Sequence, residues 1–226
     1  MRKHYWPALI VLVILVVFIL PIGGRPLVSP DETRNIEIAR EMVESGNAIT
    51  PTLNGVRYFE KPPLSYWCSS LSFLLFGQNF FALRLPCILA MLGTAWMVYL
   101  LTARCYDKKL ALVATTIFAT YPLVFVLGTV AITDMYLTFF VTATMTAYFF
   151  AVQDGVPRKR RLLLLFFSGI LSALAFLSKG FIAFAVPVIC IVPYLIWDRK
   201  WKLIFSTPWL PLLGAVLILV PWGIAI

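Results

Sequence analysis

Long apolar stretches alternate with short polar connections along most of the chain. Their lengths are near the roughly 17 to 25 residues that a helix needs to cross the hydrocarbon core of a bilayer. The pattern therefore predicts an all-α integral membrane protein with about seven transmembrane helices. The expected spans lie at residues 8–22, 85–101, 110–128, 135–152, 162–178, 181–197 and 203–226.

A further apolar stretch, residues 64–76, is too short to cross a bilayer comfortably. Counting it as a span would also place the cationic cluster at 158–161 on the outer face, against the rule that basic connections stay inside. Tyr66 and Trp67 suit the depth of the lipid headgroups. The stretch is therefore expected to form a helix that lies at the outer interface.

The distribution of charge supports this topology. With a cytoplasmic N-terminus, 12 of the 19 Lys and Arg residues fall on the inner side, and seven of the ten Asp and Glu residues fall on the outer side. This asymmetry accounts for the net charge of +9 without a nucleic-acid partner, which we do not expect.

The N-terminus and the cysteines indicate no processing and no disulfide or zinc chemistry. The MRKHYW start and the apolar run after it lack a small-residue cleavage site, which predicts an uncleaved signal anchor. The four cysteines show no C-x-x-C spacing. His4, the only histidine, is interpreted as a polar residue at headgroup level.

The chain divides into three parts: a tail with the first span at 1–22, an outer loop at 23–84, and six further spans at 85–226. Long loops in compact proteins are usually functional, so the outer loop is where chemistry is expected. In it, Ser29 followed by Glu32 predicts a capping box, and Gly46 predicts the end of a helix over 30–45.

Asp31 and Glu32 form an acidic pair in the first turn of that helix. The helix dipole favours acidic residues there, which would explain both without any function. A carboxylate pair at the bilayer surface could also accept a proton or orient a cation beside a lipid headgroup. The two interpretations stay open on spacing alone.

Lys61 lies in the motif YFEKPP at residues 58–63. Pro62 and Pro63 stiffen the backbone and should hold the ammonium group at a defined height, where it suits a lipid phosphate. The alternative is a snorkelling lysine that pairs with Glu60 or with ordinary anionic headgroups.

Asp134 and Lys179 lie at the outer ends of expected spans. Charges flanked by so much hydrocarbon are costly unless they reach water, a cavity or a partner, which makes both functional candidates. As turn residues at the interface they would need no function. Together with the outer-loop charges they gather both signs on one face, as a site for a phosphorylated lipid requires.

Five short motifs carry a resemblance to a known family. They are PDETR at 30–34, YFEKPPL at 58–64, ALRLP at 82–86, TDM at 133–135 and LSKG at 177–180. In order, spacing and placement, the chain resembles bacterial membrane glycosyltransferases related to the 4-amino-4-deoxy-arabinose lipid A transferase and the protein O-mannosyltransferases. The resemblance implies a GT-C fold. It also implies transfer of a sugar from a polyprenyl-phosphate donor to a lipid A, protein or glycan acceptor at the periplasmic face of the bacterial inner membrane.

The resemblance also implies roles for residues. Asp31 would be the catalytic carboxylate with Glu32 beside it, while Lys61 and Lys179 would bind the donor phosphate. The sugar should invert at its anomeric carbon, with no nucleotide sugar and no covalent intermediate. Glu60 matches a metal-ligand position of some relatives, but no histidine is nearby, so no cofactor is firmly implied and a divalent metal stays open. Further site candidates are Glu60, Asp134 and Arg84, the last within ALRLP.

Family members run to more than twice this length, so the chain is expected to be the catalytic N-terminal half of a transferase. The alternatives are a non-catalytic subunit that binds polyprenyl phosphate beside a partner chain carrying the missing half, and a truncated inactive fragment. A transporter is disfavoured because nearly all charges lie at span ends or in loops, whereas transporters usually place them at mid-membrane.

Overall fold

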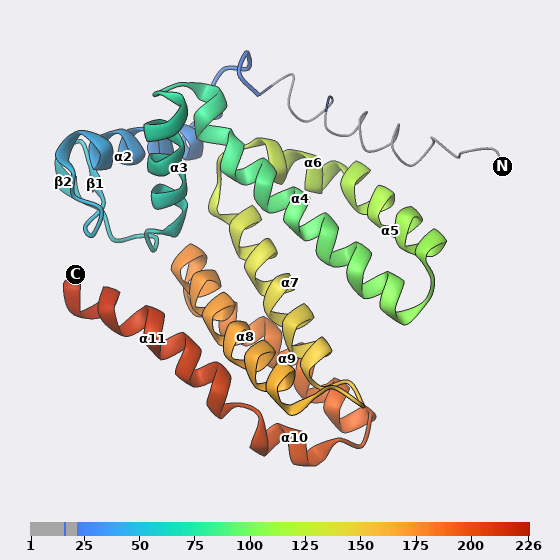
Figure 1. The fold of residues 1–226 in the computed structure, drawn as a ribbon. Coiled ribbons are helices and arrows are strands. Elements are labelled where there is room, and N and C mark those ends of the chain that lie inside the picture. Colours follow the sequence, from blue (N-terminus) through green and yellow to red (C-terminus); the bar gives the residue numbers. More distant parts are fainter. Residues whose placement is uncertain (1–15, 17–21) are drawn as a thin grey trace. The chain divides into compact units, whose positions relative to one another are not determined.

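The computed structural model describes residue 16 and residues 22–226, which fold into two compact units (Figure 1). Unit 1 comprises Met1–Arg57 and Ser65–Met135, and unit 2 comprises Tyr58–Leu64 and Tyr136–Ile226. The expected span at 8–22 lies almost wholly outside the described residues, as does His4.

Unit 1 opens with a helix and a small hairpin. The turn of the hairpin is Asn54-Gly55, and both residues have positive φ, 53° and 75°. The carboxylate of Glu41 fastens the hairpin to the helix, because it accepts hydrogen bonds from the Gly55 N–H at 3.2 Å and from the Thr52 hydroxyl. The elements are α2 (Asp31–Ser45), β1 (Thr52–Leu53) and β2 (Val56–Arg57).

The start of α2 differs from the prediction, whereas its end agrees. Gly46 ends the helix in the left-handed region at φ 67°. At the start, the cap residue is Pro30 and no side chain caps the helix, so the expected capping box is wrong. The Glu32 carboxylate accepts from the Val28 N–H at 2.8 Å rather than from Ser29. The reason is that the Glu32 side chain turns inward and binds the buried Arg84.

Helix α3 (Leu64–Phe76) coincides with the predicted stretch at 64–76. It packs on α2, where the Ser70 hydroxyl donates to the Ala39 carbonyl at 3.1 Å. Its place at a membrane interface stays a prediction.

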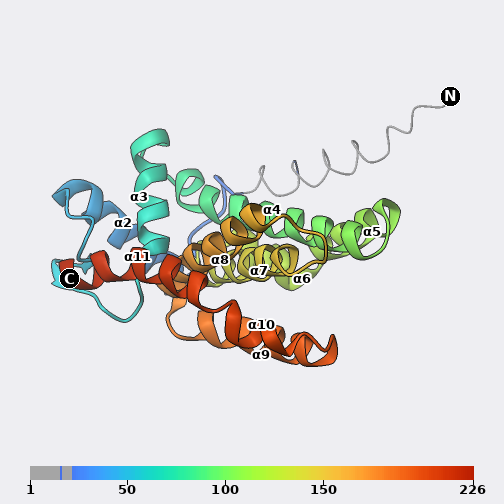
Figure 2. The same ribbon diagram turned by 60° about the horizontal axis from the view of Figure 1, so that its bottom comes forward.

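Three more helices complete unit 1 and lie side by side (Figures 1 and 2). Two of them begin with a side-chain cap. Asn79 Oδ1 accepts from the Ala82 N–H at 2.8 Å, and Asp107 Oδ1 accepts from the Lys109 N–H at 2.7 Å. The helices are α4 (Phe80–Cys105), α5 (Lys108–Thr120) and α6 (Pro122–Thr129).

A sharp break separates α5 from α6, so the apolar run predicted as one span at 110–128 forms two helices. The two helices meet at 64°. Pro122 has no N–H to continue the helix, and it forces Tyr121 into an extended conformation with φ −66° and ψ 127°. Gly128 then lets α6 lie close to α4, since a Cβ at that position would be 2.7 Å from the Met91 sulfur.

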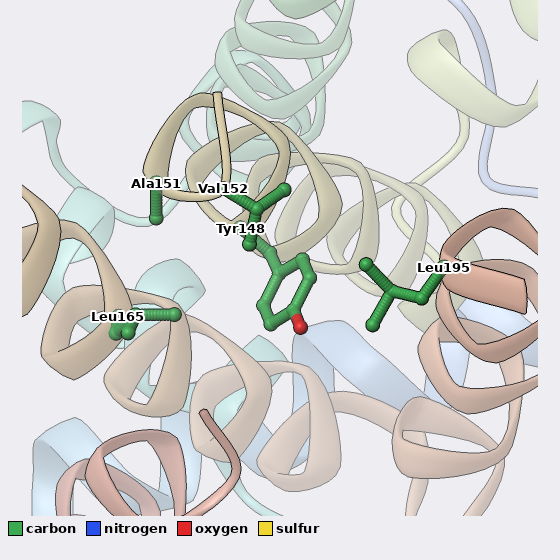
Figure 3. Close-up of a cluster of buried hydrophobic side chains, with 5 residues drawn as sticks. All are labelled: Tyr148, Ala151, Val152, Leu165 and Leu195. Carbon is green, nitrogen blue, oxygen red and sulfur yellow. The ribbon is translucent and has the colours of Figure 1, made fainter. Parts of the chain in front are cut away.

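The helices of unit 2 pack around a small hydrophobic cluster. Figure 3 shows it, with Tyr148 and Ala151 from one helix and Val152, the residue after that helix, meeting Leu165 and Leu195 from two others. The helices are α7 (Thr133–Ala151), whose first residues belong to unit 1, α8 (Arg158–Lys179), α9 (Ile182–Trp197), α10 (Trp201–Ser206) and α11 (Trp209–Ala225).

Glycines bring α8 and α11 into direct backbone contact. A Cβ at Gly169 would lie 1.9 Å from the Pro211 carbonyl oxygen, and one at Gly214 would lie 2.4 Å from the Phe166 carbonyl oxygen. No side chain fits in either place. Small residues at a helix crossing are the usual means of close packing within a membrane.

Three helices of the described part are long and apolar enough to span a membrane: Phe80–Cys105, Arg158–Lys179 and Trp201–Ala225. The bent α5–α6 pair would make a fourth if it crosses as one broken span. Helix α9 has only 16 residues, and α7 has 19 residues but is rich in threonine. Helices thus occupy all six expected spans that the structure describes, and the count of seven complete spans stays a prediction.

Candidate functional site

A buried ion pair lies at the centre of unit 1. Arg84 Nε donates to Glu32 Oε1 at 2.7 Å, and Arg84 Nη2 donates to Glu32 Oε2 at 2.8 Å. Both side chains have zero exposure. A bidentate contact of this kind fixes the angle between the two side chains as well as their distance.

The pair also satisfies the backbone around it. The remaining Arg84 donors reach the carbonyls of residues 22, 25 and 26. The Glu32 carboxylate accepts from the backbone N–H groups of Ala131 at 2.9 Å and Val28 at 2.8 Å. Nearby, Asn35 Nδ2 donates to the Ala131 carbonyl, and Arg25 donates to the Thr129 carbonyl at 2.8 Å. These contacts are called the Glu32–Arg84 network below.

The network joins two non-helical segments, of which residues 130–132 are largely buried, whereas only Ile22 is buried within residues 22–28. Residues 22–28 precede α2, and residues 130–132 join α6 to α7. Buried backbone groups outside helices and sheets need partners, since an unpaired group costs about as much as a lost hydrogen bond. The charged side chains from α2 and α4 supply these partners.

The ionised form of Glu32 is the stable one in this setting. Burial opposes ionisation and would raise its pKa, but the hydrogen bonds from Arg84 and from the Ala131 and Val28 N–H groups outweigh that effect. The pKa of Glu32 therefore lies below its ordinary value.

Asp31 occupies the accessible side of the same helical turn. Its side chain is 47% exposed, and its carboxylate lies 3.7 Å from the Arg34 guanidinium. Asp31 and Glu32 therefore do not form an accessible acidic pair, because one carboxylate faces solvent and the other is enclosed. Asp31 is the carboxylate that an incoming molecule can reach.

Asp134 lies in the first turn of α7, three residues beyond Ala131, and is partly buried. Since Glu32 and Asn35 hold both the N–H and the carbonyl of Ala131, the network ties the start of α7 to the first turn of α2. Asp31 and Asp134 are thus carried by two elements that are fastened together within unit 1.

The other candidates belong to unit 2. Lys61 is partly buried, and Pro63, two residues on, is buried. Glu60 is exposed and accepts a hydrogen bond from the Tyr58 hydroxyl at 2.7 Å. Lys179 is exposed and is the last residue of α8, where the negative end of the helix dipole favours a cation.

Within the part of the chain that the structure describes, no group of three or more His, Cys, Asp and Glu side chains comes together to hold a metal ion. Glu60, for which the motif resemblance left a metal-ligand role open, accepts a hydrogen bond from the Tyr58 hydroxyl. One carboxylate beside a phenol hydroxyl does not make up a metal site.

Sequence reasoning missed the partners of the ion pair. Arg84 is a candidate only through the ALRLP motif, and no motif singles out Asn35 or Arg25. One available signal is that Arg84 directly precedes an apolar span, where a charge needs a counterion, and Glu32 lies in the same outer loop.

The likeness to known proteins extends over the whole described fold. The family model described as dolichyl-phosphate-mannose-protein mannosyltransferase matches residues 6–226. The chain belongs to this family. The resemblance inferred from the short motifs is thereby confirmed.

Two relatives and one solved structure illustrate the family match. The undecaprenyl phosphate-alpha-4-amino-4-deoxy-L-arabinose arabinosyl transferase of Shewanella sediminis is 42% identical over 94% of this chain and 39% of its own length. The protein of the same name from Edwardsiella ictaluri is 40% identical over 98% of this chain and 40% of its own length. ArnT from Cupriavidus metallidurans bound to undecaprenyl phosphate is 27% identical, with a TM-score of 0.93 over 99% of this chain and 42% of that one.

The match to ArnT confirms the predicted all-α GT-C architecture. The chain spans about two fifths of the length of these family members. The family assignment therefore concerns the part that carries the first-loop motifs, α2 and the Glu32–Arg84 network.

Proposed function

We propose that the protein acts in the transfer of a sugar from a polyprenyl-phosphate donor to a lipid A, protein or glycan acceptor. The observation that supports this most strongly is the family match together with the placement of Asp31. It is an accessible carboxylate held in position by a buried network, in a fold shared with an ArnT that was crystallised with undecaprenyl phosphate.

Asp31 is proposed as the catalytic carboxylate. A side-chain carboxylate near the anomeric carbon can accept the proton of the acceptor hydroxyl as the new glycosidic bond forms. The sugar inverts in one displacement, and the polyprenyl phosphate leaves with the electron pair of the broken bond. Glu32 and Arg84 are proposed as positioning residues, because their polar atoms are already committed to each other and to the backbone.

Lys61 is proposed to bind the donor phosphate and to stabilise the charge that grows on it as the bond breaks. The stiff Pro62-Pro63 segment limits its backbone freedom, which reduces the entropy lost on binding. Lys179 is proposed as a second phosphate-binding cation. Asp134 and Glu60 are further candidates for orienting the sugar or the acceptor.

Sugar transfer by the complete gene product tests the role of Asp31. With a polyprenyl-phosphate-linked sugar as donor, Asp31→Asn is expected to lower the rate by about 10²–10⁴-fold, the usual contribution of a general base. Glu37→Gln is the matched control, because this acid lies on the same helix and is paired with Arg40. Full activity in Asp31→Asn would remove the proposed role.

Binding of a short-chain polyprenyl phosphate in nanodiscs tests Lys61. A hydrogen bond to a charged group contributes about 1.5–3 kcal/mol, so Lys61→Ala is expected to weaken binding by about 10- to 100-fold. Arg57→Ala, an exposed cation of the hairpin, is the control. Equal affinity in wild type and Lys61→Ala would exclude this lysine from the phosphate site.

A non-catalytic subunit that binds polyprenyl phosphate is the second candidate, because binding of the donor phosphate by Lys61 does not require that this chain carries out the transfer. Binding that depends on Lys61 without any sugar transfer, followed by transfer after addition of a chain with the remaining spans, would favour it. No transfer and no binding under any condition would favour an inactive fragment.

The proposed orientation has a cytoplasmic N-terminus and a periplasmic site in the bacterial inner membrane. It can be measured in intact cells with a thiol reagent that does not cross the inner membrane. Asn54→Cys in the hairpin turn should react and Gly155→Cys between α7 and α8 should not. The reverse labelling would invert the topology.

A further inference from the structure

One end of unit 2 carries a group of cations that the chain leaves largely uncompensated. The connection between α7 and α8 and the connection between α9 and α10 meet there, since Lys200 Nζ lies 3.5 Å from Asp154 Oδ2 (Figure 1). Seven basic residues face two carboxylates, which leaves a formal charge of +5. This basic end consists of Arg158, Lys159, Arg160, Arg161, Arg199, Lys200 and Lys202, with Asp154 and Asp198.

The two carboxylates do not neutralise the exposed cations. Both contact the same lysine, because Lys200 Nζ also lies 2.9 Å from Asp198 Oδ2. Arg161 is partly buried, and its Nε donates to the Ala151 carbonyl at 3.2 Å. The other five cations are exposed, and none has an ion pair among the residues that the structure describes: Arg158, Lys159, Arg160, Arg199 and Lys202.

Like charges so close together repel one another, and the first turn of α8 holds no acidic residue to offset them. The helix dipole adds to the cost, because it favours carboxylates rather than guanidinium groups in a first turn. The charge of this end is therefore offset by water, counterions or a partner rather than by carboxylates of the described residues.

Exposed aromatic side chains adjoin the cations. Trp197 is 91% exposed, Trp201 is 54% exposed, and Phe205 is 78% exposed. Indole rings at the ends of apolar helices are typical of the membrane–water interface, where the ring lies at headgroup depth. The candidate spans Arg158–Lys179 and Trp201–Ala225 both begin at this end, which puts it at the edge of the hydrocarbon if these helices span a membrane.

We propose that the basic end binds anionic phospholipid headgroups of the leaflet that it faces. The guanidinium groups of Arg158, Arg160 and Arg199 suit the phosphodiester, since a planar fork of donors can bind two of its oxygens. The rule that basic connections stay inside concerns insertion, whereas the proposal concerns which lipids the folded protein prefers. Single-stranded nucleic acid also binds cations and aromatic rings, but the adjoining hydrocarbon surface favours a lipid.

The experiment uses the complete chain, reconstituted in phosphatidylcholine bilayers that contain traces of spin-labelled lipid. The association constant of spin-labelled phosphatidylglycerol relative to phosphatidylcholine is measured by electron paramagnetic resonance. The wild type should prefer the anionic lipid, and the preference should fall severalfold between about 0.05 and 0.5 M NaCl because salt shortens the Debye length. Removing one basic residue near an anionic surface is expected to lower the association about fivefold.

Two neutralised variants locate the effect. R158Q/K159Q/R160Q changes the connection before α8, and R199Q/K202Q changes the connection before α10. Both should lose anionic preference by at least about fivefold. R158K/R160K, the matched control, keeps the charge and should retain most of it.

Three results would overturn the proposal: no anionic preference in the wild type, a preference that survives both neutralisations, or a single-stranded RNA oligonucleotide that displaces the lipid. If a variant does not fold, the salt dependence of the wild type still decides whether the preference is electrostatic. Sugar transfer is not part of any readout, so the outcome is independent of the proposed function.

Discussion

Replacing Arg84 with alanine should destabilise unit 1 severely. Arg84 donates to both oxygens of Glu32 and to three backbone carbonyls. Its removal leaves a buried carboxylate without a counterion, and truncating one partner of a buried ion pair typically costs about 3–5 kcal/mol. Each carbonyl that stays buried and unpaired adds about 1–3 kcal/mol, less where water enters the space left by the side chain. We therefore expect a loss of at least about 3 kcal/mol.

The assay is thermal unfolding of the purified protein in detergent, followed by tryptophan fluorescence. For a chain of this size a change of 1 kcal/mol shifts Tm by about 2–4 °C, so Arg84→Ala should lower Tm by at least about 6 °C. Arg40→Ala is the matched control. Its guanidinium pairs with Glu37 and Glu44 on the surface of α2. The loss of Arg40 therefore leaves no buried charge without a partner and should leave Tm nearly unchanged.

A double variant separates the ion pair from general disruption. If Glu32 and Arg84 act mainly through each other, Glu32→Gln/Arg84→Ala should lose less stability than the sum of the two single variants. A Tm for Arg84→Ala equal to that of Arg40→Ala would show that the network does not hold unit 1 together. Strict additivity in the double variant would show that the backbone contacts dominate and the ion pair does not.

Three further predictions follow from local contacts. Because the pKa of Glu32 is lowered, its ionised form stabilises the fold above the ordinary carboxyl pKa of about 4.3, and this stability is lost as pH falls through the lower folded value. Tm of the wild type should therefore drop more steeply than that of Glu32→Gln below about pH 4.3, and parallel curves would contradict this. Gly169→Ala should destabilise the fold by at least about 1–3 kcal/mol, since its methyl group would lie 1.9 Å from a carbonyl oxygen of α11. Gly223→Ala is the control, because a methyl group there meets no other atom within 4 Å. Equal Tm values for the two variants would exclude tight contact between α8 and α11. Tyr148→Phe should cost about 1 kcal/mol by removing the 2.7 Å hydrogen bond to Thr207 while the ring stays packed, and an unchanged Tm would show that this bond adds nothing.

Local signals allowed much of the fold to be predicted. The bounds of α3 follow from Pro63 before it and Gly77 after it, and the end of α2 follows from Gly46, which adopts the left-handed conformation that glycine favours. In these places one or two residues determine the backbone.

Other features could not be found in this way. The α5–α6 break lies inside an unbroken apolar run, and average hydrophobicity does not reveal a bend. Pro122 marks the place of the break, but the hydrophobic pattern alone favours one continuous helix. The capping box failed because a local rule competed with a distant partner, since Arg84 is 52 residues from Glu32. Asp31 was found as a candidate, but its separation from Glu32 into an exposed and a buried carboxylate required the three-dimensional contacts.

The Glu32–Arg84 network also has a consequence for the order of biosynthesis. Arg84 bonds to a carbonyl 62 residues earlier, and Glu32 bonds to an N–H group 99 residues later. A ribosome adds only about 5–20 residues per second, so Ala131 is made several seconds after Glu32. The network is therefore complete only after the segment before α7 has been made, when Glu32 and Asn35 can bind Ala131 and so tie the start of α7, which carries Asp134, to α2, which carries Asp31. Assembly of the candidate site thus requires α4 to α6 to have been made first.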